Sequence, residues 1–280
     1  MEISLVDEQA FHFVPLITVE VAHDRVEQKK TQMVSGPLGA LFNRMKPEEV
    51  QLLGVENRLE AYWQVTISSR TVYDRARMYS VPVQGSEVKA VTVLEHELPI
   101  EFKDKGGAFT LNVLEHCKEE ARVTRAFSGL QAELLDPSKY AAYAKTLIAD
   151  LNSFAPPGVL VVPPQVRATA VVRQVMSEVI RPVSNAHTIL EERVDVEAVD
   201  LNFRPVYAFE YELVGKGKRS VIEFNALTGE FNAGGRKLQD QIKGMLTRDL
   251  LFDVTADAVG ILVPGGSIAV KLVKAVVDRK

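Results

Sequence analysis

Short runs of alternating apolar and polar residues, the pattern of half-buried strands, dominate the first hundred residues of the chain. In the run TVYDRARMYSVPV, residues 71–83, tyrosines and arginines alternate with other side chains. Gly85 and Ser86 then supply turn residues before the next run. The pattern predicts an antiparallel meander with strands at residues 10–22, 50–57, 60–67, 71–83 and 88–93.

Helical periodicity follows the meander. Apolar side chains recur at about every 3.6 positions, at Leu111, Leu114, Cys117 and Ala121. A second helix is predicted over residues 136–151, because Asp136 suits an N-cap and Pro137 suits the first helical position. A shorter helix is predicted over residues 36–45. We expect the two longer helices to cover one face of the sheet.

Two proline pairs flank a short apolar run in residues 155–164, and they mark the best domain boundary in the chain. Beyond it the pattern starts afresh with an amphipathic helix at residues 167–179, which Pro182 ends. Three strands and a short helix are predicted after it, at residues 188–201, 205–214, 219–224 and 236–245. The predicted domains are an N-terminal α+β unit (1–155), a second α+β unit (165–245) related to residues 45–100, and an apolar helical tail (246–280).

Two distant segments share one pattern. Residues 50–67 and 194–211 each contain an apolar strand, an acidic turn with asparagine, and an aromatic strand that includes Tyr62 or Tyr207. An internal duplication explains this likeness, and so does the general tendency of strands to alternate and to carry aromatic residues. If the duplication is real, two units pack about a pseudo-twofold axis with a groove between them.

The segment 204–231, RPVYAFEYELVGKGKRSVIEFNALTGEF, has a hairpin followed by a strand that ends in the turn Asn225 to Glu230. This segment resembles PepSY-type domains, in which such a strand ends in a "DA-TGE" turn. The family pattern carries aspartate where this chain has Asn225, and the N-terminal half lacks the turn. The resemblance covers about a tenth of the chain and implies a small α+β module with a regulatory or binding role.

The last residues differ in character from the rest. Residues 254–263 and 268–277 are apolar, and Pro264 to Gly266 divides them. Neither stretch reaches the ~20 apolar residues of a membrane-spanning helix. The favoured interpretation is a helical hairpin that folds back on the protein or on a second subunit. The alternatives are an interfacial helix on a membrane, with Lys271 and Lys274 toward anionic headgroups, and a tail that orders on binding a partner.

The composition is that of a globular protein, with 46% apolar and 25% charged residues. A net charge of −4 disfavours a nucleic-acid partner, which calls for a basic surface. The single cysteine, Cys117, excludes an internal disulfide and a cysteine-rich zinc site. The acidic N-terminus lacks the features of a signal peptide, so the expected location is the cytoplasm, with membrane-peripheral attachment through residues 254–280 as an alternative.

The chain carries no nucleophile elbow, phosphate-binding loop or dinucleotide fingerprint. The contexts VLEHEL (93–98) and VLEHCK (113–118) repeat four residues and offer one set of metal ligands, Glu95, His96, Glu115, His116 and Cys117. Their spacing matches no established metal motif. We therefore predict no catalytic residue, no metal and no cofactor.

Aromatic residues concentrate on the predicted strands, and arginines surround Asp74. Core packing and ion pairing within the sheet explain them most simply, whereas an exposed sheet face would use them to bind a partner. The candidate binding residues are Tyr62, Trp63, Tyr73, Arg75, Arg77, Tyr207, Phe209 and Tyr211.

The sequence thus predicts an α+β fold with two antiparallel β-meander units flanked by helices, plus a C-terminal apolar helical hairpin. The predicted function is a non-enzymatic binding or assembly role through protein–protein contacts or self-association, with the C-terminal segment docking or oligomerising. The alternatives are a peripheral membrane protein and a hydrolase or metal enzyme without a linear motif.

Overall fold

The computed structural model describes residues 1–34, 46–103, 106–214, 217–235, 248–252, 254 and 271–274. The protein is mostly β, with one large mixed sheet and few short helices. The helical elements are α1 (Val19–Glu27), a 3-10 turn (Pro47–Glu49), α3 (Ala168–Val179) and α4 (Arg248–Leu251), and residues 30–34 are helical as well. The strands are β1 (Glu2–Leu5), β2 (Gln9–Phe13), β3 (Val50–Val83), β4 (Ala90–Val93), β5 (His96–Pro99), β6 (Glu101–Lys103), β7 (Gly106–Ser128), β8 (Leu134–Leu135), β9 (Lys145–Leu147), β10 (Leu160–Val162), β11 (Thr188–Leu213), β12 (Lys218–Asn225), β13 (Phe231–Gly235) and β14 (Lys271–Lys274).

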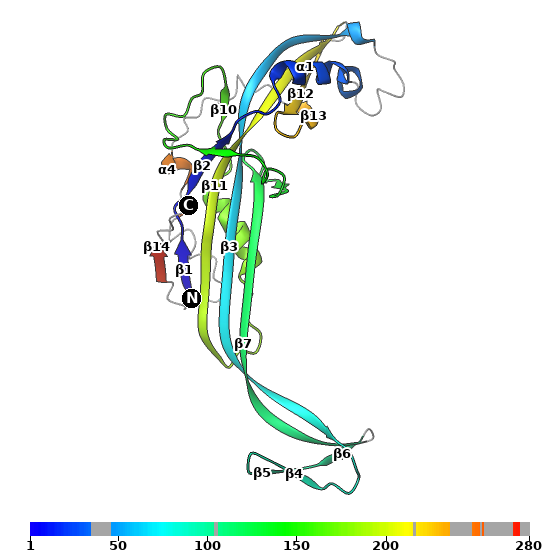
Figure 1. Ribbon diagram of the computed structural model, residues 1–280, viewed down its shortest axis with the longest axis vertical. Helices are drawn as coiled ribbons and strands as arrows, with labels where there is room; N and C mark the ends of the chain where they lie inside the picture. The colour runs from blue at the N-terminus through cyan, green and yellow to red at the C-terminus, as the bar shows by residue number, and fades with distance from the viewer. Residues whose placement is uncertain are drawn as a thin grey trace.

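Three very long antiparallel strands form the body of the sheet (Figure 1). β3 lies in the middle and pairs with β11 from Val50↔Leu213 to Asp74↔Thr188. On its other side β3 pairs with β7 from Tyr62↔Ser128 to Val83↔Gly107, without a register shift. Since β3 is bonded on both edges through residues 62–74, this region is the most completely paired part of the sheet.

The outer edge of β11 is filled by several short strands. β1 and β2 run parallel to it, opposite residues 193–196 and 200–203, and β12 runs antiparallel opposite residues 206–213. β10 pairs parallel with residues 58–60 of β3. These parallel additions make the sheet mixed, and they bring the N-terminal strands against the centre of the body.

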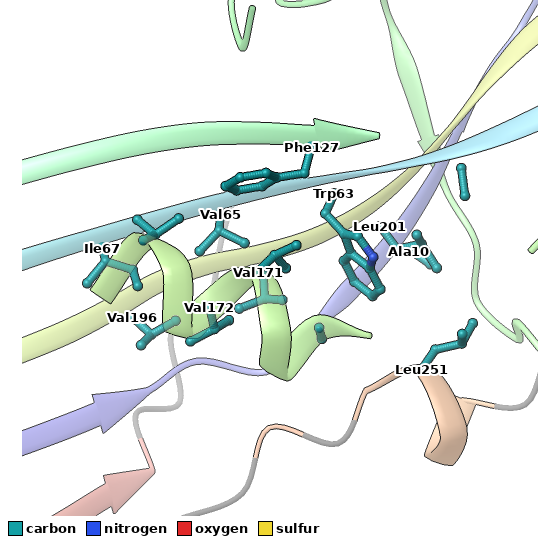
Figure 2. Packing of buried hydrophobic residues seen from close by; sticks show 14 of the residues in the cluster. Ala10, Trp63, Val65, Ile67, Phe127, Val171, Val172, Val196, Leu201 and Leu251 are labelled. Carbon is teal, nitrogen blue, oxygen red and sulfur yellow. The ribbon is translucent and has the colours of Figure 1, made fainter. Parts of the chain in front are cut away.

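One helix covers the middle of the sheet. Figure 2 shows Val171 and Val172 of α3 packed beside Val65, Ile67 and Val196 of the strands. Trp63 is completely buried in the same cluster, and its Nε1 donates to the Val166 carbonyl at 2.7 Å. The apolar period of residues 167–179 predicted this helix, and the structure confirms it, with the helix ending before Pro182.

A second buried cluster lies under α1. Every second side chain of β11 points to the same face of the sheet. On this face, Leu201 and Phe203 lie in the α3 cluster, and Phe209 and Tyr211 lie in the α1 cluster. The Thr18 side chain caps α1 by accepting from the Val21 amide at 3.5 Å. One row of β11 side chains therefore contributes to both cores.

The sequence analysis predicted too many turns and too many helices. Residues 50–83 form one strand rather than three, and residues 188–213 also form one. The helix predicted around residues 111–121 is strand β7, whose burial alternates with a period of two because it pairs with β3 throughout. The two-meander α+β description is thus replaced by a mostly-β protein with a large mixed sheet.

Other predicted elements differ from the structure or lie outside the part of the chain that it describes. Residues 136–151 form turns and strand β9, although Asp136 does accept from the Ser138 amide at 2.9 Å as a local cap. Residues 10–22 hold β2 and the start of α1 rather than one strand. Residues 271–274, within the second helix predicted for the C-terminal hairpin, form strand β14 beside β1, so this part of the prediction is wrong, and residues 255–270 and 275–280 lie outside the described residues. The helices predicted at residues 36–45 and 236–245 lie outside the described residues.

Gly129 offers a test of the packing at the end of β7. Its amide donates to the Ala61 carbonyl at 3.0 Å, and a Cβ at this position would lie 2.6 Å from the same oxygen. We expect Gly129→Ala to lower the free energy of unfolding by about 1–3 kcal/mol, measured by urea denaturation, because backbone must move to admit the methyl group.

Gly54→Ala is the matched control, since a Cβ there meets no atom within 4 Å. This variant should be neutral or slightly stabilising because alanine restricts the unfolded chain. Equal destabilisation by the two substitutions would show that the close approach at Gly129 does not matter.

Candidate functional site

A two-stranded arm extends from the body beyond Thr188, the first residue of β11. The last β11 pair is Thr188↔Asp74, whereas β3 and β7 stay paired from Arg75↔Glu115 to Val83↔Gly107. The arm curves away from the body in Figure 1 and carries β4, β5 and β6 at its far end. We call residues 75–115 the β arm and residues 84–106 within it the tip.

A charged network joins the two strands of the β arm at its base. The Glu115 carboxylate accepts hydrogen bonds from Arg75 Nε at 2.6 Å and from the Tyr79 hydroxyl. Arg77 Nη1 lies 3.6 Å from Glu115 Oε1. The hydrogen bonds from Tyr79 and Arg75 hold the pKa of the Glu115 carboxyl below its usual range. The network stabilises the pairing of β3 with β7 directly beyond the last residue of β3 that pairs with β11.

The junction between body and arm is held on both faces of the ribbon. The Tyr73 hydroxyl donates to Glu119 at 2.7 Å, and this hydrogen bond, with burial, raises the pKa of Tyr73 to about 12. His116 Nδ1 lies 2.7 Å from Asp74 Oδ1, and the Asp74 carbonyl accepts from the His187 amide at 2.7 Å. The arm therefore leaves the body from a fixed base.

The tip contains an unusual hairpin turn. β4 and β5 pair up to Val93↔His96, so Leu94 and Glu95 form a two-residue loop, with φ angles of 48° and 68°. Positive φ at both positions defines a type I′ turn, which strongly prefers Asn-Gly. Leucine is unsuited to this backbone, and Leu94 is also 89% exposed.

Other apolar side chains of the β arm face solvent. Met78 is 72% exposed, and the arm also exposes Tyr79, Phe102 and Leu114. A two-stranded ribbon has no second layer to cover both of its faces. The arm thus exposes apolar side chains at a distance from the body (Figure 1).

A buried polar cluster lies in the body, on β3, β11 and β12. Arg58 is almost fully buried and donates to Glu56 at 2.6 Å and to Glu223 at 3.3 Å. Arg204 donates to Glu60 at 3.3 Å and to the Tyr140 hydroxyl at 2.9 Å. Burial, and then the neighbouring Glu60 charge, raise the pKa of Glu223.

A hollow of about 230 Å³ lies beside this cluster, bordered by Gly54, Arg58 and Ala208. A larger hollow of about 390 Å³ lies near the end of α3, bordered by Ser69, Glu119 and Arg181. Both contain charges of each sign.

Six of the eight residues predicted to bind a partner lie in the interior. Tyr207 is the most exposed of them at 7%, and the others are Tyr62, Trp63, Tyr73, Phe209 and Tyr211. Five of them pack in the three buried clusters, and the sixth, Tyr73, donates its hydroxyl to Glu119. Arg75 and Arg77 do lie on the β arm, where they pair with Glu115.

The suggested metal ligands do not form a cluster. Glu95 and His96 lie at the tip, whereas Glu115, His116 and Cys117 lie on β7, where successive side chains point to opposite faces. Within the described part of the chain, no group of three or more His, Cys, Asp or Glu side chains is placed to hold a metal ion.

The sequence analysis missed the β arm. Its strands were recognised in part, but Leu94-Glu95 gives no turn signal, so the hairpin could not be located there. The turn at Asn225 was recognised correctly: its Oδ1 accepts from the amides of Leu227 and Thr228, and Gly229 has a φ of 75°.

Comparison of the chain with protein-family models, curated proteins and solved structures gave no match in any of the three. The PepSY-like character of residues 204–231 therefore stays a prediction. Among the described residues, no helix has both the length and the apolar character needed to cross a membrane.

The Glu115 network predicts how the β arm responds to acid. A depressed carboxyl pKa stabilises the folded arm above the usual glutamate range, and this stabilisation is lost as pH falls through the lowered pKa. We expect Tyr79→Phe to raise the Glu115 pKa and to move the acid-induced loss of arm amide protection to higher pH, measured by NMR.

Tyr143→Phe serves as the control, because Tyr143 lies in the body and packs beside Tyr140. This change should leave the Glu115 titration where it is. An unchanged Glu115 pKa in Tyr79→Phe would show that the Tyr79 hydroxyl does not stabilise the carboxylate.

Proposed function

We propose that the protein is a non-enzymatic binding or assembly protein, and that the β arm is its contact element. The observation that carries the proposal is Leu94, a fully apolar side chain at 89% exposure in a turn whose backbone disfavours it. Natural sequences break local rules chiefly at functional positions. A leucine kept at the end of a projecting hairpin is best explained by a surface that it contacts.

The β arm is separate from the interior of the body. None of the three buried clusters of the described residues includes a residue of 75–115. The arm therefore adds little to the stability of the body, although it orders a long stretch of chain at considerable entropic cost. Binding a partner would offset that cost, because the exposed apolar area of the arm would then be removed from water.

The mixed charge of the tip favours a protein partner over a polyanion. Glu87, Glu95, Glu97 and Glu101 lie there, whereas Lys89 and Lys103 are the basic residues among its described positions. An acidic, partly apolar tip suits a protein surface and opposes anionic lipid headgroups and nucleic acid. This argues against contact between the arm and an anionic membrane surface.

The sequence analysis assigned docking to the C-terminal segment. Most of residues 254–280 lie outside the described residues. Residues 271–274 pair in parallel with β1 at the edge of the body sheet, so this part of the segment belongs to the fold. The proposal moves the main contact from the C-terminal segment to the β arm.

Replacing Leu94-Glu95 by Asn-Gly separates binding from stability. This double variant gives the type I′ turn its preferred residues, so we expect the free energy of unfolding to stay equal or rise by up to about 1 kcal/mol. Retention of interacting proteins from an extract of the source cells should fall at least several-fold, measured by quantitative capture on the immobilised chain.

Leu16→Asn is the matched control, since Leu16 is a body residue with 67% exposure. Capture by this variant should equal capture by the unmodified chain. If the Asn-Gly variant retains the same proteins at the same level as the control, the tip is not a contact element.

A further inference from the structure

The β4–β5 hairpin at the end of the β arm has one apolar face and one polar face. Its register places Val91 opposite Leu98 and Thr92 opposite Glu97. Directly opposite residues of an antiparallel pair point to the same face, and every second residue along a strand returns to that face. Val91, Val93 and Leu98 therefore share one face, which we call the apolar face, whereas Thr92 and Glu97 share the other.

The apolar face lies outside the three buried clusters of the described residues. Its side chains are half-buried, and Leu94 in the adjoining turn is 89% exposed. His96, which lies opposite Val93, borders the face and is exposed. Two strands alone cannot form a core. Contact with a partner would remove this surface from water, which is favourable.

Acidic side chains surround the end of the hairpin. Glu95 is the second residue of the turn, Glu97 lies on the polar face, and Glu87 precedes β4. All three are exposed. Within the described part of the chain, none of their carboxylates takes part in an ion pair or a hydrogen bond. Their charge is therefore available to a partner.

The described basic side chains of the tip have partners within the tip itself. Lys89 Nζ donates to the Ser86 carbonyl at 2.9 Å and lies 5.3 Å from the centre of the Phe102 ring. Lys103 Nζ lies 3.6 Å from a carboxylate oxygen of Glu101. The two lysines thus leave the three unpaired glutamates uncompensated, and the end of the hairpin presents negative charge beside its apolar surface.

We infer that the partner is a protein with an apolar groove bordered by lysine or arginine side chains, and that the β4–β5 hairpin enters this groove. The inference rests on the proposed function and specifies the chemistry of the partner. Leu94 and the apolar face occupy the groove, while Glu95 and Glu97 meet its basic border. Buried apolar anchors supply most of the affinity at such interfaces. Complementary charge orients the partners and accelerates their association.

The hairpin is attached to the arm by backbone hydrogen bonds. The Ile100 amide donates to the Lys89 carbonyl at 3.0 Å, directly after β5. β6 then pairs with residues 106–108 of β7. Figure 1 shows β4 and β5 at the far end of the arm, away from the body. The hairpin therefore meets a partner in a preformed conformation, which lowers the entropic cost of binding.

Photo-cross-linking of the full-length chain identifies the partner and its surface. We replace Leu94 by the photoreactive residue benzoylphenylalanine, illuminate the chain in an extract of the source cells, and sequence the cross-linked peptides by mass spectrometry. We expect one protein, cross-linked at an apolar groove that lysine or arginine side chains border. The same photoreactive residue at Leu16, an exposed position of the body, is the control and should not cross-link this protein.

A charge series on the hairpin then tests the basic border, with the cross-linked protein purified as the probe. Glu95→Gln with Glu97→Gln should weaken its binding at least several-fold, and Glu95→Lys with Glu97→Lys should weaken it further. These differences should vanish at about 0.5 M salt, where charges are screened over a few ångströms. Glu48→Lys with Glu133→Lys makes the same change of net charge at exposed body positions and should leave binding unchanged. Amide NMR checks that β4 and β5 stay paired in each variant.

Three results would overturn the inference: an acidic or uncharged cross-linked surface, equal binding across the charge series, or cross-links to lipid, to nucleic acid or to nothing in place of a protein. The proposed function fails on a different result, namely unchanged capture by the Asn-Gly variant. Loss of capture by that variant together with equal binding across the charge series would leave the tip as a contact element and exclude the basic border.

Discussion

The fold depends on β3 being hydrogen-bonded along both edges. Paired with β11 on one side and β7 on the other, it holds three strands in register through residues 62–74, and the α3 core packs on this part of the sheet. Every other described strand of the body adds to the outside of this unit. Beyond Thr188, the first residue of β11, β3 and β7 continue without a third strand, and the projecting arm follows directly from this difference in strand length.

The two ends of β3 therefore have opposite characters. In the body, residues 58–63 and 65–67 of β3 are buried, with Trp63 in the α3 cluster, and Val50 is buried in the α1 cluster. In the arm the same strand exposes Met78 and depends on the charged contacts of Glu115 rather than on a core. A single strand thus connects a rigid interior to a surface available for contacts, and the base of the arm is positioned by the body.

The sequence predicts part of this structure and misses the rest for physical reasons. The amphipathic helix at residues 167–179 and the Asn225 turn are determined locally, by apolar spacing and by a side chain that caps its own backbone, and both were recognised. The length of β3 is set by pairing with residues far along the chain, which no local pattern records. β7 was mistaken for a helix because the charged residues of its edge resemble the polar face of one, and only pairing with β3 reveals the two-residue period.

The candidate site escaped prediction for the opposite reason. Tyrosine and tryptophan drew attention because of their chemistry, yet cross-strand neighbours and the covering helices bury them. Leu94 looks ordinary in sequence, and its significance comes from a backbone conformation and an exposure that exist only in three dimensions.

The strand connectivity also has a consequence for biosynthesis. β3 and β7 are close in sequence and can pair as a hairpin as soon as residue 128 has left the ribosome, whereas β11, whose Leu213 pairs with Val50, is made much later. Until then the apolar face around Trp63 and the inner edge of β3 are uncovered. Contacts of such long sequence separation form slowly and leave nascent chains prone to aggregation. We expect the growing chain to require chaperones between the synthesis of β7 and that of β11, a time that the rate of translation sets.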